Sequence, residues 1–107
     1  MLFRSTEAGE KQLENLMFEI SAKPVQIFLD FNAVIVNLDA LSPKNQMKCL
    51  TDIEANVKTL KSYLEENLKA KENVPEIPQT GLSVLHQQFV LAQSIETWIE
   101  ELKLKYE

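Results

Sequence analysis

The residue best suited to chemistry in this sequence is His86, the only histidine of the chain. A histidine on the surface of a helical bundle can accept a phosphoryl group, and imidazole changes charge near neutral pH. Two glutamines and Phe89 follow His86, in place of the Lys and Gly that help to seat a phosphoryl group in phosphotransfer domains. His86 also shares a helical column with Gln93 and Glu100, which form a polar flank. We therefore expect an exposed histidine without special chemistry.

Metal binding and nucleophilic catalysis have little more support. Ser83 stands three residues before His86, so the Glu-x-x-His spacing of diiron bundles is absent at this histidine. Neighbouring carboxylates on a helix diverge by about 100°, and the adjacent acidic pairs are Glu65/Glu66 and Glu100/Glu101. Cys49, the only cysteine, lies at the edge of an apolar row, where a small buried side chain is the usual explanation. The sequence predicts no catalytic residue, no cofactor site and no metal site, so we expect a protein that is not an enzyme.

The composition is that of an ordinary globular protein. A chain of 107 residues is long enough for one core and too short for two, so we expect a single helical domain over residues 1–107. Apolar residues at 45% and charged residues at 25% argue against disorder. Four prolines and two glycines are few for an all-β domain, whose tight turns need both. The composition therefore favours helices.

Charge and hydropathy exclude several partner classes. The net charge of −5 opposes binding to nucleic acid, because affinity for phosphates comes mainly from Lys and Arg. No stretch of the sequence approaches 18 uninterrupted apolar residues, and Glu7, Glu10 and Glu14 stand where a signal peptide needs an apolar run. A single cysteine also cannot form an intrachain disulfide. We therefore expect a cytoplasmic protein that binds neither nucleic acid nor membranes.

Three segments have the apolar spacing of amphipathic helices. The first is predicted from about residue 7 to 22, after Ser5 or Thr6 as its N-cap. Its apolar row repeats at i, i+3, i+4 and i+7, and comprises Leu13, Leu16, Met17 and Ile20. Ser42 followed by Pro43 predicts the N-cap and first residue of a long helix that ends near residue 71.

The last predicted helix follows a loop. Two prolines and one glycine interrupt the helical period in NVPEIPQTG, residues 73–81. The final helix is expected from about residue 83 to 105, with a broad apolar stripe that contains Leu91, Ile95 and Trp98.

The most apolar stretch, residues 24–41, allows two structures. As a helix it places seven apolar residues in one arc of about 140° and five more on the opposite side, with Asn and Asp residues between. As a β-hairpin over residues 25–38, its first strand alternates well, but Phe31-Asn32-Ala33 is a poor tight turn. We favour the helix. The predicted fold is then all-α, a bundle of about four helices with a central apolar second helix and a long third helix; the alternative is α+β.

A helix with two apolar faces must be covered from two directions. One covering is the rest of the same domain, and the other is a second protein chain. The second face comprises Val25, Leu29, Ala33, Val36 and Ala40. We predict that these five residues form an interface with a protein partner or a homodimer.

Two functions from different classes follow from these patterns. The favoured one is a non-enzymatic protein-protein interaction module, such as a small adaptor, a chaperone-like protein or a regulatory subunit, that presents an apolar helix face. The alternative is a helical bundle that holds a small ligand in its interior or transfers a phosphoryl group through His86.

Overall fold

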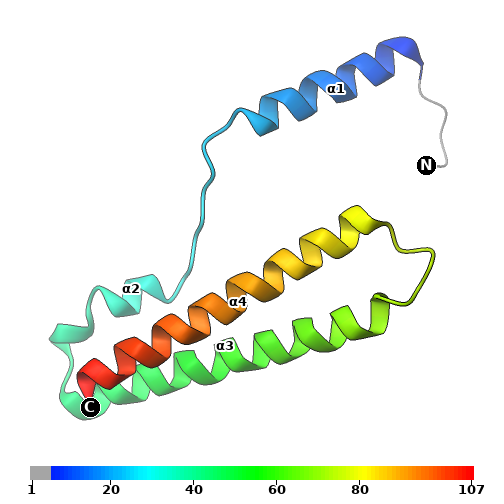
Figure 1. The fold of residues 1–107 in the computed structure, drawn as a ribbon. Coiled ribbons are helices and arrows are strands. Elements are labelled where there is room, and N and C mark those ends of the chain that lie inside the picture. Colours follow the sequence, from blue (N-terminus) through cyan, green and yellow to red (C-terminus); the bar gives the residue numbers. More distant parts are fainter. Residues whose placement is uncertain (1–5) are drawn as a thin grey trace.

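The computed structural model describes residues 6–107, which form a long helical hairpin with an N-terminal extension (Figure 1). The hairpin consists of α3 (Pro43–Lys71) and α4 (Gln79–Tyr106), which run antiparallel and pack against each other. Helix makes up 77% of the described residues and no strand occurs among them, so the predicted all-α class is confirmed and the α+β alternative is wrong.

Three further elements precede the hairpin. Helix α1 (Glu7–Ser21) lies apart from it and makes few contacts with any other described element (Figure 1). The single-turn helix α2 (Asn32–Ile35) and the 3-10 turn η1 (Leu38–Ala40) lie at the end of the hairpin where α3 begins and α4 ends. The predicted number of four helices and the long third helix are therefore confirmed.

Local capping explains where two of these helices begin. The Thr6 side-chain oxygen accepts a hydrogen bond of 3.0 Å from the Gly9 amide, and acidic Glu7 and Glu10 lie near the positive end of the α1 dipole. The Ser42 hydroxyl accepts a hydrogen bond from the amide of Asn45, directly before Pro43 at the start of α3. Thr6 and Ser42 are thus N-caps as predicted, while Ser5 lies outside the described residues.

Helix α4 begins at Gln79, about four residues earlier than predicted. The carbonyl of Pro78 accepts backbone hydrogen bonds from Gly81 and Leu82, which closes the first turn. A methyl group at Gly81 would meet only Pro78, at 3.9 Å, so this glycine sits in an ordinary helical turn. The glycine therefore lies inside the helix and does not extend the loop.

The continuous helix predicted over residues 24–41 is wrong. Residues 24–29 form an extended, non-helical segment (Figure 1). Within residues 24–41, only the four residues of α2 are α-helical. Asn37 donates a side-chain hydrogen bond of 2.7 Å to the Ala33 carbonyl, a local contact that competes with helical pairing. The β-branched residues of this stretch also lower its helix propensity. A two-helix hairpin could in any case cover only one face of such a helix.

The core of the molecule is a small cluster at one end of the hairpin. Leu38, Leu50 and Ile99 come from η1, α3 and α4, and each is at most 1% exposed. Partly buried neighbours surround them: Val34, Ile35, Cys49, Ile53, Leu102 and Tyr106. Gln46 donates a 3.0 Å hydrogen bond to the Leu38 carbonyl and so ties η1 to α3. The apolar stretch thus supplies a core residue even though it is not one long helix.

Two ion pairs close one side of the hairpin. Lys61 Nζ lies 2.9 Å from Glu96 Oε1, and Lys103 Nζ lies 3.1 Å from Glu54 Oε1, with all four side chains largely buried. The hydrogen bond to Glu96 raises the pKa of the Lys61 ammonium above its ordinary value of 10.5, against the lowering effect of burial. This contribution to stability is present at neutral pH and is lost only as pH rises through the raised pKa. The pairs fix the antiparallel register of α3 and α4.

Truncation of the core should destabilise the hairpin far more than truncation of its surface. We expect Ile99→Ala to lower the free energy of unfolding by about 2–4 kcal/mol, because it leaves a cavity between three elements. Leu104→Ala removes a similar side chain from the same helix at a position that is 67% exposed, and should change that free energy by about 0.5 kcal/mol or less. Urea denaturation followed by circular dichroism measures both, and equal effects would contradict the core assignment.

Candidate partner-binding surface

Helix α1 carries an apolar stripe that nothing within residues 6–107 covers. Leu13, Leu16, Met17 and Ile20 are each at least 50% exposed, and α1 has no buried residue. Their spacing places them on one side of the helix, while Lys11, Glu14 and Asn15 lie on other sides. The sequence predicted the spacing of this stripe, and the structure leaves the stripe exposed.

The segment that follows α1 is also apolar and exposed. Val25, Ile27 and Phe28 are between 74% and 89% exposed, more than the stripe of α1. Pro24 restricts the backbone around it and favours an extended course, which Figure 1 shows between α1 and α2. We call residues 7–30 the N-terminal arm. It presents eight large apolar side chains to solvent: seven in the stripe and in residues 25–28, and Phe18 on another side of α1.

The five residues of the predicted interface do not form one helix face. Val25 lies in the arm, Ala33 in α2, Ala40 in η1, and Val36 follows α2; all four are exposed. Leu29 is half-buried. The structure therefore separates the five, because the helix that would have aligned them is absent. Their role in partner binding remains a prediction, and the largest exposed side chains are those of Val25 and Val36.

Phe31 anchors the end of the arm to the hairpin. Its ring stacks on Trp98 of α4, with 6.0 Å between ring centroids and 21° between the ring planes. Trp98 belongs to a column of α4 with Leu91 and Val84, spaced seven residues apart. This column therefore faces the side on which the arm meets the hairpin, and it continues beyond the anchor.

Beyond the Phe31 anchor, the same side of the hairpin is apolar and uncovered. On α3, Leu60 lies two turns after Ile53, which packs on the core, and Tyr63 lies one turn further. On α4, Leu91 and Val84 continue the column of Trp98. We call these four residues the open groove. Their exposed fractions are between 46% and 63%. The ion pairs lie on the opposite side, so polar contacts close one side of the hairpin while the other stays open.

The residues considered for chemistry remain apart. His86 is exposed, as expected from its polar flank, and shares a shallow hollow with Glu72, whose carboxylate would repel a phosphoryl group. Cys49 is half-buried against the core cluster and is a free thiol. The described part of the chain contains no group of three or more His, Cys, Asp or Glu residues placed to hold a metal ion.

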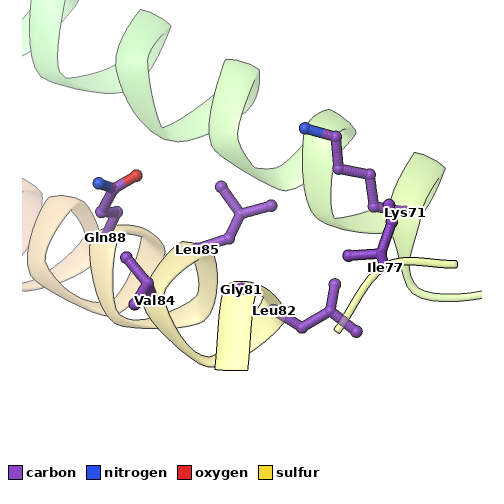
Figure 2. Close-up of a pocket in the computed structure, with 7 residues that line it drawn as sticks. All are labelled: Lys71, Ile77, Gly81, Leu82, Val84, Leu85 and Gln88. Atoms are coloured by element: carbon purple, nitrogen blue, oxygen red, sulfur yellow. The ribbon is translucent and has the colours of Figure 1, made fainter. Parts of the chain in front are cut away.

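A hollow of about 330 Å³ lies at the loop end of the hairpin. Figure 2 shows Ile77 of the loop together with Leu82 and Leu85 of α4 around it, and Lys71 at the end of α3. Gln88 is the other polar lining residue. Small-molecule sites are mostly apolar but use several converging polar groups to fix the orientation of the ligand. This hollow has the size of such a site and few of the polar groups.

None of the helices described in residues 6–107 combines the length and the apolar character needed to cross a bilayer. Comparison with protein-family models, with curated proteins and with solved structures finds no match to this chain. We therefore infer function from the geometry of the exposed surfaces.

Sequence reasoning missed most of the exposed apolar surface for one reason. It centred the partner interface on the second face of a central helix over residues 24–41, and not on the stripe of α1. A signal that could have shown otherwise is Pro24, which ends α1 and begins an apolar stretch rich in Asn and Asp. Such a stretch favours turns and extended backbone over a long helix.

The Phe31 anchor can be tested by fluorescence, because Trp98 is the only tryptophan. Phe31→Ala should shift the Trp98 emission to longer wavelength, since the indole loses its stacked ring and gains contact with water. The control Phe18→Ala removes an equal side chain from α1, where it is 64% exposed and outside the apolar stripe. It should leave the emission unchanged. An unchanged spectrum in Phe31→Ala would contradict the anchor.

Proposed function

We propose that this chain is a non-enzymatic protein-protein interaction module, whose N-terminal arm binds a protein partner. The observation that carries the proposal is the exposure of eight large apolar side chains over residues 13–28, seven of them in the stripe of α1 and the segment that follows it. Monomeric proteins rarely expose contiguous apolar patches of several hundred Å² without a binding role. The hairpin acts as the scaffold from which the arm extends.

The area of the arm fits a protein interface. An apolar side chain that is at least half exposed leaves on the order of 100 Å² in water, so seven leave roughly 700 Å². A standard interface buries about 800 Å² on each partner. The arm alone thus approaches the area that a specific complex needs, and the open groove adds to it.

Charge favours a protein over a membrane or a nucleic acid. Beside its apolar stripe, α1 carries Glu7, Glu10, Glu14 and Glu19 against a single Lys11. Helices that lie on membranes have a polar face rich in Lys and Arg, which attracts anionic lipids. Acidic α1 would be repelled by such lipids and by phosphate backbones. Binding of α1 to an apolar groove of a polypeptide involves no such electrostatic repulsion.

Binding of a small ligand is the second candidate. The hollow at the loop end has an apolar lining from Ile77, Leu82 and Leu85, which supports an apolar ligand (Figure 2). It exposes far less apolar surface than the arm, so we rank it second. Phosphotransfer through His86 has no comparable support beside Glu72.

A charge placed in the stripe of α1 should abolish partner binding and leave the fold intact. Leu16→Asp lies on a helix outside the core, so we expect the hairpin to keep its helicity while any complex is lost. Native mass spectrometry of the purified chain, with light scattering, measures the complex. Asn15→Asp adds the same charge on another side of α1 and should keep the complex.

Two results would contradict this proposal. One is a bound small-molecule mass on an otherwise monomeric chain, which favours the ligand-binding candidate. The other is a Leu16→Asp chain that unfolds, which would mean that the stripe belongs to the core of its own domain.

A further inference from the structure

We infer that the partner is a second copy of this chain, and that two copies exchange their N-terminal arms so that each arm lies in the open groove of the other. This inference rests on the proposed function and names its partner. It follows from the match between arm and groove, from the connection between them, and from the area that the exchange buries.

The stripe and the groove match in character. The stripe from Leu13 to Ile20 spans eight residues of helix, about 10 Å between its end residues at 1.5 Å per residue. In the register set by the Lys61–Glu96 and Lys103–Glu54 pairs, Leu60 and Tyr63 of α3 lie toward the Phe31 anchor. Leu91 and Val84 of α4 continue toward the loop, where Val84 lies beside Lys71, so the open groove is longer than the stripe. A helix laid between α3 and α4 would bury its stripe against both, in the manner of a three-helix bundle.

The neighbours of the groove tolerate an acidic helix. Thr59 borders Tyr63 on α3, while Gln87 and Ser94 border Leu91 on α4, and all three are uncharged and exposed. Acidic residues of α1 would therefore meet no row of carboxylates along the middle of the groove. At the edge of the groove, Lys58 and Glu66 share a hollow with Tyr63, so that edge carries one charge of each sign.

The connection between α1 and α2 favours a second copy over the chain's own groove. It comprises ten residues, 22–31, which reach about 33 Å when extended, whereas helices of a bundle are usually joined by 2–8 residues. Val25, Ile27 and Phe28 would remain on the outside if this segment merely returned α1 to its own hairpin. If two copies exchange arms about a two-fold axis, the two segments cross, and their apolar side chains bury one another.

The numbers of surfaces and the buried area agree with such a dimer. Each chain has one arm and one open groove, so a two-fold pair brings each arm against a groove. Two arms and two grooves bury roughly 2,200 Å² in total, within the range of obligate homodimers. An unrelated partner that bound the arm alone would leave the groove uncovered.

Cross-linking distinguishes the possible occupants of the groove. On a Cys49→Ser background, which removes the only native thiol, Met17→Cys places a thiol in the stripe of α1 and Leu91→Cys places one in the groove. The chain that carries both is treated with a short bifunctional maleimide and analysed by denaturing gel and mass spectrometry. We expect a covalent dimer as the main product. Asn15→Cys with Leu91→Cys is the matched control, because Asn15 lies off the stripe, and should give at least fivefold less dimer.

The other outcomes each overturn the inference in a distinguishable way. A monomer cross-linked within itself would place the arm in its own groove, which contradicts both the exchange and the proposed function. A chain that stays monomeric and carries no cross-link between its two thiols would contradict the exchange alone and leave binding of another protein by the arm in place. Dimer yields equal to those of the control would show random encounter and also contradict the exchange.

Discussion

A pair of antiparallel helices buries only the line of side chains that lies between them, and this constraint governs the rest of the structure. In the hairpin of α3 and α4, the line consists of Leu50, Val57 and Leu64 facing Ala92 and Ile99. The apolar stripe of α4 is broader than one line, so part of it must be covered from elsewhere or stay in water. The ion pairs of Lys61 and Lys103 close the opposite side and leave the apolar one available.

The two ends of the hairpin meet this constraint differently. Near the start of α3, residues 31–38 fold over the apolar side, with Phe31 on Trp98 and Leu38 in the core. Toward the loop, no described segment performs the same role, and the groove stays open. The apolar side chains of the arm are likewise uncovered, because they pack in no groove of their own chain. Exchange of arms between two copies would cover both the groove and the arm.

The fold could be predicted from the sequence wherever local signals decided the structure. The caps Thr6 and Ser42, the bounds of α3 and the all-α class follow from residue types and helical spacing, which act over a few residues. Residues 24–41 could not be predicted, because their course depends on how much surface α3 and α4 offer to cover them. Helical periodicity showed that these residues are apolar on two sides, but not that Asn37 would form a local hydrogen bond in place of a longer helix.

For the candidate site, the sequence predicted the apolar character of the surface but not its position. An apolar surface for a protein partner was expected, and exposed apolar residues are present, but they centre on α1 and residues 25–28 and not on one face of a second helix. Val25 is the one residue that belongs both to the predicted five and to the arm's eight large exposed side chains. The stripe of α1 was visible in the sequence, whereas its exposure depends on a tertiary contact that the hairpin does not make.

The central claim is that this fold is completed by a second copy, and the most direct measurement is the melting temperature as a function of protein concentration. A dimer that unfolds to two separate chains becomes more stable by mass action as its concentration rises. For two chains of 107 residues, a hundredfold increase should raise the melting temperature by roughly 6 °C. A melting temperature that stays the same over that range would show that each chain folds alone, and would contradict the account.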